Sequence, residues 1–234
     1  MIRRVPQANL KVACPACGQK LDASDVLAFQ HVECPACKSE LMIPYRFGQY
    51  LLEEPLSESH LAGVYRALDL KLDREVAIKV LDEDLAENEM LVEHFLKLGR
   101  RIALLNHSNI IPIYSSGTFK ELPYLVMELM EDFSLRDMLH QTDAPPPCDQ
   151  SLHIAEQVAR GLEAANREGV HHHNLNPANI LLGPGNVVKL TDFGMAAVWE
   201  AAMNEHTEQA GEYPDAGYMS PELLKGEQAD CRAD

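Results

Sequence analysis

The sequence predicts an α+β protein in which a small cysteine-rich module precedes a larger domain with strands first and helices later. Three observations lead to this fold class. Two C-P-A-C tetrapeptides lie within residues 12–43. Apolar and polar residues alternate in 74–82, as they do in a β-strand. In 84–105 and 151–168, apolar residues recur at spacings of three and four, as on one face of a helix.

Length and charge limit the classes of function. The chain has 234 residues, of which 46% are apolar, enough for a sizeable core. Its net charge of −16 argues against non-specific binding to nucleic acid or to an anionic membrane. No apolar run approaches the roughly 18 residues of a membrane-spanning helix, and the first residues lack the apolar stretch of a secretory signal. We therefore expect a cytoplasmic protein without a membrane span.

Four of the six cysteines form two C-x-x-C pairs, Cys14 with Cys17 and Cys34 with Cys37. Sixteen residues separate the pairs, a spacing typical of zinc sites. Four thiolates complete a tetrahedron without an open position, so the expected ion is a structural Zn²⁺. The module, expected over 1–45 and ended by Pro44, resembles a zinc ribbon, and the metal would supply its folding energy. The alternative is a pair of disulfides or redox dithiols.

The strongest functional signal lies in the second half of the chain. It consists of H-H-N-L-N-P-A-N at 172–179 and D-F-G at 192–194, with a β-hairpin expected between them at the turn 183–186. These phrases resemble the catalytic loop and metal-binding loop of protein kinases, H-R-D-L-x-x-x-N and D-F-G. S-P-E at 220–222 is similar to the family's A-P-E motif.

The resemblance covers about 46–234 and is closest to the Ser/Thr kinases of bacteria. It implies a protein-kinase-like bilobal fold with a β-rich N-lobe over about 46–130. A helical C-lobe would follow over about 131–234, truncated after S-P-E. An apolar spine that links the lobes in the family is expected here at Ile102, Ile113, His172 and Phe193.

The expected N-lobe keeps one nucleotide-binding motif and loses another. V-A-I-K at 76–79 places Lys79 where kinases contact the α- and β-phosphates of ATP. The glycines of the loop over the phosphates are replaced by Ser57, Ser59 and Ala62. The αC glutamate that would pair with the lysine falls on Leu98.

The resemblance further implies ATP and Mg²⁺ as cofactors. Backbone groups near Glu128 and Met130, in the hinge between the lobes, would hold the adenine. Mg²⁺ would be held by Asn179 and Asp192. The full set of residues expected to contact the nucleotide is Lys79, Val64, Ala77, Glu128, Met130, Leu181, Asn179 and Asp192.

Asn174 occupies the position of the catalytic aspartate. A neutral amide cannot accept the substrate's proton, and general-base catalysis contributes roughly 10²–10⁴-fold to a rate. The lysine two positions further on is replaced by Asn176, and the preceding arginine by His173. The first hypothesis is therefore a catalytically impaired Ser/Thr kinase-like protein, a pseudokinase. It would act as a regulatory or scaffolding module for a protein partner and bind ATP weakly.

Two alternatives are open at this stage. The first is an active ATP-dependent Ser/Thr protein kinase with an atypical catalytic loop and a protein substrate. The second is a zinc-ribbon nucleic-acid binder. The near-neutral charge of residues 1–46, with six Lys and Arg against four Asp and Glu, disfavours nucleic acid as a partner.

Overall fold

A computed structural model describes residues 2, 6–130, 133–141, 144–196, 198, 216–225, 227 and 229–234. The chain divides into two units. The first contains residues 1–87 and 117–129, and the second contains 88–116 and 130–234. None of the helices among the described residues is long and apolar enough to cross a membrane.

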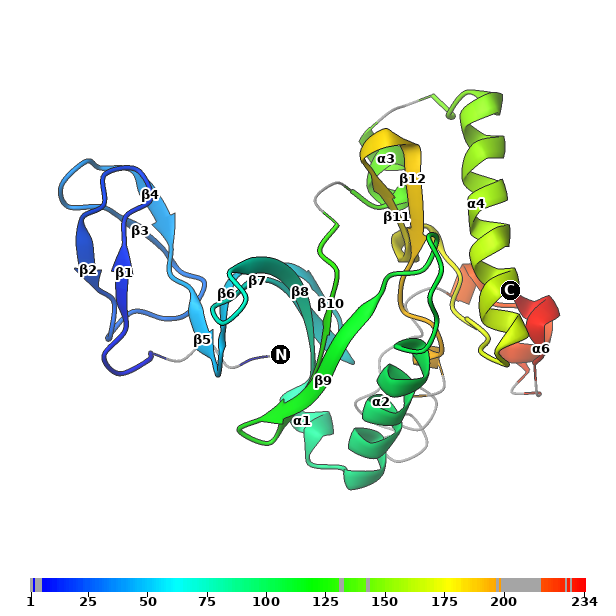
Figure 1. The fold of residues 1–234 in the computed structure, drawn as a ribbon, viewed down its shortest axis with the longest axis horizontal. Helices are drawn as coiled ribbons and strands as arrows, with labels where there is room; N and C mark the ends of the chain where they lie inside the picture. The colour runs from blue at the N-terminus through cyan, green and yellow to red at the C-terminus, as the bar shows by residue number, and fades with distance from the viewer. Residues whose placement is uncertain are drawn as a thin grey trace. The chain divides into compact units, whose positions relative to one another are not determined.

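The N-terminal ribbon consists of two similar hairpins. Strands β1 (Lys11–Ala13) and β2 (Lys20–Asp22) form one, and β3 (His31–Glu33) and β4 (Glu40–Met42) form the other (Figure 1). The two sequences superpose with an offset of twenty residues, so that each C-P-A-C lies at the same place after its first strand. The ribbon is therefore an internal repeat. Its small hydrophobic core contains Cys14, Ala23, Cys34, Leu41 and Ile43.

A six-stranded sheet follows the ribbon and curls as Figure 1 shows. Its spatial order is β5-β6-β7-β8-β10-β9, and the pairs from β5 to β8 and between β8 and β10 are antiparallel. The strands are β5 (Tyr45–Phe47), β6 (Tyr50–Glu58), β7 (Ala62–Asp69), β8 (Arg74–Leu81), β9 (Ile113–Phe119) and β10 (Leu122–Met127). The central strand β8 covers the expected strand 74–82.

The ribbon and this sheet share one hydrophobic core in the first unit. Phe29 of the ribbon stacks on Tyr65 of β7, with ring centroids 5.3 Å apart and the planes within 16°. Both rings are buried together with Phe47 and Tyr50. Offset stacking of this kind adds about 0.5–1.5 kcal/mol to the burial of the rings. The ribbon is thus packed onto the sheet and not merely attached to it by the chain.

The second unit holds the helices and the hairpin between the two kinase motifs. Its α-helices include α2 (Glu89–Ile102), α3 (Leu135–Gln141), α4 (Cys148–Arg167) and α6 (Pro221–Leu224). The hairpin has strands β11 (Ile180–Gly183) and β12 (Val187–Leu190), joined by the turn at 184–186, as expected. It packs on α4, and its strands supply Ile180, Val188 and Leu190 to a core that also contains Ile102 and Phe193.

Two helix predictions need correction. The expected helix 84–105 is interrupted, because Asn88 accepts hydrogen bonds from the backbone N–H groups of Met90 and Leu91 and begins a new helix. A short helix α1 (Glu83–Ala86) precedes it in the first unit. Helix α4 begins at Cys148 and not at 151, directly after its prolines. Its buried face is Ile154, Val158, Gly161 and Ala165.

Candidate functional site

The four paired cysteines lie together. Their Sγ atoms are all within 4.8 Å of one another, with Cys14–Cys37 and Cys17–Cys34 both at 3.7 Å. For a tetrahedral ion with Zn–S bonds of about 2.3 Å, the sulfur–sulfur edge is about 3.8 Å. The thiols are therefore spaced as a Zn²⁺ S₄ site requires, with two ligands from each hairpin. No disulfide forms among the six cysteines, so the structure does not support the disulfide alternative.

Each C-P-A-C turn is closed by equivalent backbone bonds. The N–H of Gly18 donates to the Cys14 carbonyl, and the N–H of Lys38 donates to the Cys34 carbonyl. Both donors have a positive φ, 73° and 64° respectively, which favours glycine in the first turn and strains lysine in the second. The two turns thus have the same backbone arrangement, and the four thiols converge between them.

Ser39 is a residue of this cluster that sequence reasoning missed. Its hydroxyl lies 2.9 Å from the Sγ of Cys37 and 3.3 Å from that of Cys14. The hydroxyl lowers the pKa of Cys37, and it lowers the pKa of Cys14 to about 6 in the metal-free cluster. The equivalent residue of the first hairpin, Gln19, bonds to the neighbouring backbone instead. Only one hairpin therefore supplies a side-chain hydroxyl to the sulfurs.

In the second unit, the catalytic-loop residues form a network of three asparagines. The side-chain amide of Asn179 donates to the Asn174 carbonyl at 2.8 Å. The amide of Asn176 donates to the same carbonyl at 3.1 Å and to the Asn174 Oδ1 at 3.2 Å. Asn176 is only 2% exposed, and its own Oδ1 caps the N–H of Ala178. The acceptor atom of Asn174 is thus engaged by a neighbouring amide.

The D-F-G loop lies beside this network. The N–H of Thr191 donates to the Asn179 carbonyl, which holds Asp192 next to Asn179. Asp192 has a φ of +66°, a conformation that aspartate adopts more readily than most residues. Because the Asn179 amide nitrogen donates to the Asn174 carbonyl, the Oδ1 on the other side of this amide is directed away from Asn174. The Asn179 oxygen and the Asp192 carboxylate are of the donor type that Mg²⁺ prefers.

The expected spine residues of the second unit are in contact. The rings of His172 and Phe193 lie 4.6 Å apart, and Phe193 shares its core with Ile102 and the partly buried Ile113. His172 is fully buried. Burial lowers its pKa, although the charges of Asp234 and Asp192 act in the other direction. This imidazole is therefore neutral and structural. The four cysteines are the one group of three or more His, Cys, Asp or Glu side chains among the described residues that could hold a metal ion.

Asp234 also holds the catalytic loop, and sequence reasoning missed it. Its two carboxylate oxygens accept hydrogen bonds from the backbone N–H groups of His172 and His173, at 2.8 and 2.6 Å. His173 has a positive φ of 57°, which these bonds help to maintain. Asp234 lies 62 and 61 positions after His172 and His173, and no local pattern in the sequence connects them.

Leu98 replaces the αC glutamate with an apolar contact. A Cβ atom added to Gly194 of the D-F-G motif would come within 2.6 Å of its Cδ1. Leu98 therefore covers the glycine at the end of this loop, and Gly194 itself has a φ of +66°. The helix α2 and the loop are fixed by packing where the family has a charged residue.

The first unit carries the expected lysine and its neighbours on the sheet. Lys79 lies on the central strand β8, only 6% exposed, between Val64 of β7 and Leu125 of β10. Ala77 precedes it on the same face of the strand and pairs with Arg66. Glu128 follows the end of β10 in this unit.

The turn between β6 and β7 has an internal hydrogen-bond network. The Ser59 hydroxyl lies 3.3 Å from the N–H of Leu61, 3.2 Å from the N–H of Ala62 and 3.0 Å from the Ala62 carbonyl. In kinases, the backbone of the equivalent loop covers the phosphates. Here, two of its N–H groups already have an acceptor inside the loop. The absence of the family's glycines did not by itself reveal these hydrogen bonds within the turn.

The remaining expected residues belong to the second unit. Met130 lies against the hairpin, since a Cβ atom on Gly183 would meet its Cε at 2.5 Å. Leu181 pairs with Lys189 across the hairpin and forms a bridge with Ser134. The set predicted for the nucleotide is therefore divided between the units. In the second unit, Asn179 and Asp192 lie near each other, and Asn179 contacts Asn174 of the predicted catalytic position.

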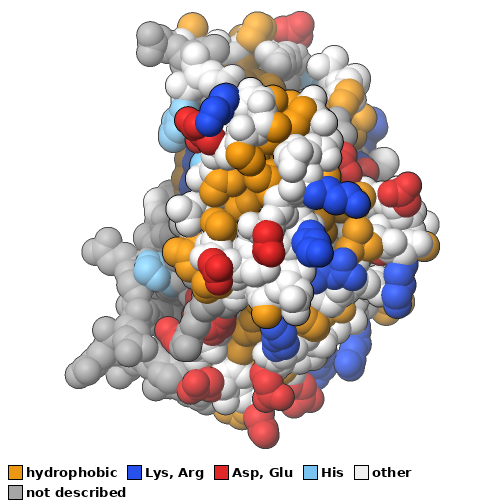
Figure 2. All heavy atoms as spheres, turned by 90° about the vertical axis from the view of Figure 1, so that its left-hand side faces the viewer, with side chains coloured by type: hydrophobic (Ala, Val, Ile, Leu, Met, Phe, Trp, Pro, Cys, Tyr) orange, Lys and Arg blue, Asp and Glu red, His pale blue; other side chains and the backbone are white. Residues whose placement is uncertain are grey.

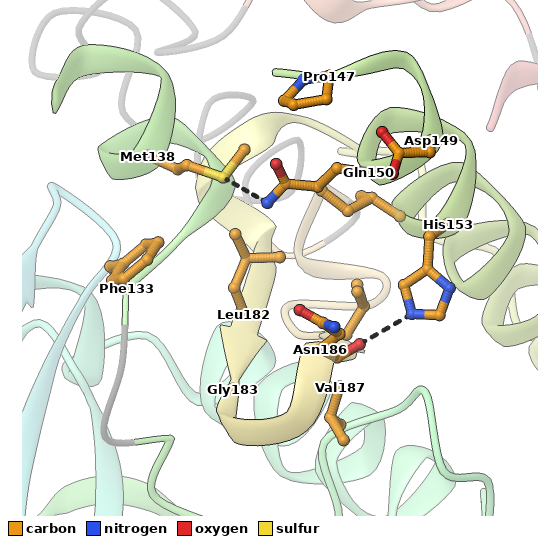
Figure 3. A pocket seen from close by; sticks show the side chains of 12 residues that line it. Phe133, Met138, Pro147, Asp149, Gln150, His153, Leu182, Gly183, Asn186 and Val187 are labelled. Carbon is orange, nitrogen blue, oxygen red and sulfur yellow. Dashed lines mark hydrogen bonds between the residues drawn. The ribbon is translucent and has the colours of Figure 1, made fainter. Parts of the chain in front are cut away.

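A cavity of about 570 Å³ lies in the second unit between α3, the start of α4 and the hairpin (Figure 3). Phe133, Met138 and Leu182 give it an apolar side. Its polar side includes His153, whose ring nitrogen lies 3.2 Å from the Asn186 carbonyl. None of the residues expected to bind nucleotide lines it. It is therefore separate from the catalytic loop.

The sequence profile described as "Protein tyrosine and serine/threonine kinase" matches residues 51–234. The chain belongs to this protein kinase family. Serine/threonine-protein kinase PknB of Mycobacterium leprae is 34% identical over 195 residues, which cover 82% of this kinase chain and 31% of that protein. PknB of Mycolicibacterium smegmatis is 36% identical over 81% of this chain and 30% of its own length. The chain thus spans about a third of the length of these relatives.

Solved structures agree with this family. The kinase domain of Mycobacterium tuberculosis PknI has a TM-score of 0.63 and 26% identity, and the match covers 81% of this chain and 71% of that one. A second structure of the same domain gives a TM-score of 0.64 over 81% and 69%. The predicted fold class and the predicted bacterial Ser/Thr kinase-like family are confirmed.

Proposed function

We propose that this kinase-fold protein is a pseudokinase, a regulatory or scaffolding module that binds a protein partner and transfers phosphate very slowly or not at all. One observation carries the proposal: the Asn174 side chain is a neutral amide whose oxygen already accepts a hydrogen bond from Asn176. A carboxylate at this position accepts the substrate's proton in active kinases. The asparagine offers no base, and its orientation is fixed by a buried neighbour.

The nucleotide is expected to bind, but weakly. Lys79 is kept for the phosphates, and the Asn179 oxygen and the Asp192 carboxylate would hold Mg²⁺, whose charge would offset that of the phosphates. Against this, Ser59 occupies two backbone N–H groups of the loop over the phosphates. We expect MgATP to act as a conformational ligand that stabilises the fold.

The cysteine cluster supports a structural Zn²⁺ site in this protein. Four thiols with the edge lengths of a tetrahedral S₄ site leave no position for a substrate. The ion would join the two hairpins of the ribbon. Figure 2 shows both basic and acidic side chains on the ribbon side of the molecule, with several Lys and Arg side chains next to one another. The net charge of −16 nevertheless favours a protein partner over nucleic acid.

The proposal is tested by phosphoryl transfer from labelled ATP to casein and to the protein itself. We expect the wild-type rate to equal that of the Lys79→Ala variant, within detection. Asn174→Asp restores one missing group and should raise the rate by much less than the roughly 10²–10⁴-fold of a complete base, because Ser59, Asn176 and Leu98 remain. Wild-type transfer that disappears in Lys79→Ala would show an active kinase and overturn the proposal.

Nucleotide binding is measured separately, as a thermal shift with MgATP on the zinc-loaded protein. A shift that requires Mg²⁺ and is lost in Asp192→Ala would support a retained, non-catalytic nucleotide site. No shift at millimolar MgATP would contradict nucleotide binding and leave the pseudokinase role to the protein surface alone.

A further inference from the structure

The ribbon and the sheet enclose a groove of about 620 Å³ within the first unit. Strands β1 and β4 form its ribbon side, and residues of β6, β7 and β8 form the other. All three residues of β1 and all three of β4 line it. Side chains alternate between the two faces of a strand, so a groove over one face would meet only every second side chain. A groove lined by all three residues of a strand therefore runs along the edge of that strand.

These edges are open to pairing in the described part of the ribbon. There, β1 pairs only with β2, and β4 pairs only with β3. Each strand therefore keeps one edge without a neighbouring strand. An extended segment of another chain can add to such an edge through backbone hydrogen bonds, with its alternate side chains entering the pockets alongside.

The floor of the groove is apolar. Leu10 and Val12 contribute from the ribbon, and Leu51 contributes from β6. None of these three side chains is fully buried. The volume is within the range of ligand-binding pockets. An occupant therefore needs apolar side chains at some of its positions.

Carboxylates outnumber cations around this floor. Glu40, Glu53, Glu54 and Glu75 face two cations, Lys11 and Arg66. Arg66 is already engaged, since its Nη2 lies 2.8 Å from Glu75 and its Nη1 lies 3.6 Å from Glu54.

An irregularity in β6 concentrates the negative charge. The register with β7 shifts between Leu52 and Glu54, so the consecutive residues Glu53 and Glu54 both line the groove. Glu53 is half-buried, and no hydrogen bond or ion pair joins it to another described side chain. Burial raises the pKa of Glu53 and the charges of Glu75 and Glu54 raise it further, although the charge of Arg66 acts in the other direction. A further cation beside Glu53 would favour its charged form.

We propose that this groove binds an extended segment of a partner protein in which Lys or Arg alternates with aliphatic side chains. The apolar floor takes the aliphatic side chains, and Glu53 and Glu54 take the basic ones. A nucleic-acid backbone would be repelled by the same carboxylates, and a second copy of this chain, with a net charge of −16, is a poor match. The proposal does not depend on the state of the catalytic loop.

The test uses fluorescence anisotropy with the full chain, loaded with zinc. The probe is a short labelled peptide in which Lys and Arg alternate with Val and Leu, and the control peptide has Glu in place of each basic residue. We expect a Kd on the order of micromolar for the basic peptide, weakened by added salt, and no binding of the acidic one.

Variants locate the binding. Glu53→Gln with Glu54→Gln should weaken it about tenfold, and Val12→Thr, which keeps the shape of the side chain, should weaken it as well. The matched control replaces two exposed acids of the ribbon outside the groove, Asp25→Asn with Glu33→Gln, and should bind as the wild type does. Circular dichroism checks that each variant is folded.

Three results would overturn the proposal. The basic peptide could fail to bind at all. It could bind equally well to the Glu53 and Glu54 variant and to its control, which would indicate attraction to the overall charge only. Sedimentation could instead show that the groove variant dissociates a dimer of the wild-type chain, in which case the occupant is a second copy.

Discussion

Ser59 and Asn174 are small polar side chains that each occupy the hydrogen-bonding groups a phosphoryl-transfer site would need. The hydroxyl of Ser59 lies within hydrogen-bond distance of two backbone N–H groups in its turn, and the oxygen of Asn174 accepts from Asn176. Neither substitution disturbs the local fold, because each polar group finds a partner nearby. The proposed loss of phosphoryl transfer is thus compatible with a well-ordered protein.

Replacing Ser59 by glycine should tighten MgATP binding. The change removes the internal acceptor of the Leu61 and Ala62 N–H groups, which then become available to phosphate oxygens. Hydrogen bonds to charged groups contribute about 1.5–3 kcal/mol each, part of which is lost to the added freedom of the loop, so we expect about tenfold. Isothermal titration calorimetry measures the Kd. Ser57→Gly is the control, and equal affinity of both variants would contradict the role given to Ser59.

The stability of the second unit should depend on pH through His172. Its pKa is lowered in the folded state from the usual 6.5, so below that pH the unfolded chain binds a proton that the folded chain does not. The contribution of His172 to the free energy of unfolding is therefore fully present above about pH 6.5. It falls on acidification, by at most about 1.4 kcal/mol per pH unit. Urea unfolding at several pH values measures it. The profile of His172→Phe should be flatter, and identical slopes would count against a neutral buried imidazole.

At the scale of elements, periodicity predicted most helices and strands but not where they begin. The hairpin β11–β12 and the strand β8 lie where the sequence indicated, because Gly183-Pro184-Gly185-Asn186 and alternating residues are strong local signals. The break at Asn88 was missed, since the apolar stripe continues on both sides of it. Gly161 belongs to the buried face of α4, but it has no side chain and so does not contribute to a pattern of apolar side chains.

Gly161 lies in the middle of α4 because the helix approaches another backbone segment there. A Cβ atom at this position would come within 2.9 Å of the Asn109 carbonyl and 3.0 Å of Leu190. Gly161→Ala improves helix propensity by about 1 kcal/mol, but forcing the segments apart costs about 1–3 kcal/mol. We expect a net loss of stability. Thermal unfolding against Ala155→Gly, at an exposed position of the same helix, separates packing from propensity, and a stabilised Gly161→Ala would contradict the close approach.

At the scale of the whole molecule, the sequence identified the family and the cysteine cluster but not the contacts between distant segments. The V-A-I-K, D-F-G and S-P-E motifs are local, so they could be recognised one by one. Asp234 binds the catalytic loop across a long stretch of chain, and Phe29 meets Tyr65 across the expected boundary between ribbon and kinase domain. Such contacts depend on the folded topology and have no local pattern.

Removing zinc should weaken the first unit beyond the ribbon. Because Phe29 packs in the same core as Tyr65 and Phe47, loosening the ribbon uncovers part of the sheet. We expect one Zn²⁺ per chain by metal analysis and a lower temperature of unfolding after chelation, as seen by calorimetry. Cys17→Ser should reproduce the effect, while Cys148→Ser, an exposed cysteine outside the cluster, should not. An unfolding curve that chelation leaves unchanged would show that the ion is not structural.

The stacking of Phe29 on Tyr65 also constrains how the ribbon and the kinase domain can evolve. A ribbon that were only tethered to a kinase domain could be lost or exchanged between genes without any change in the domain. Here the Phe29 ring buries one face of the Tyr65 ring. Losing the ribbon would therefore expose that aromatic face of the sheet to water. Descendants that keep both parts should retain an aromatic pair at these two positions, and descendants that lose the ribbon should carry a polar residue where Tyr65 stands.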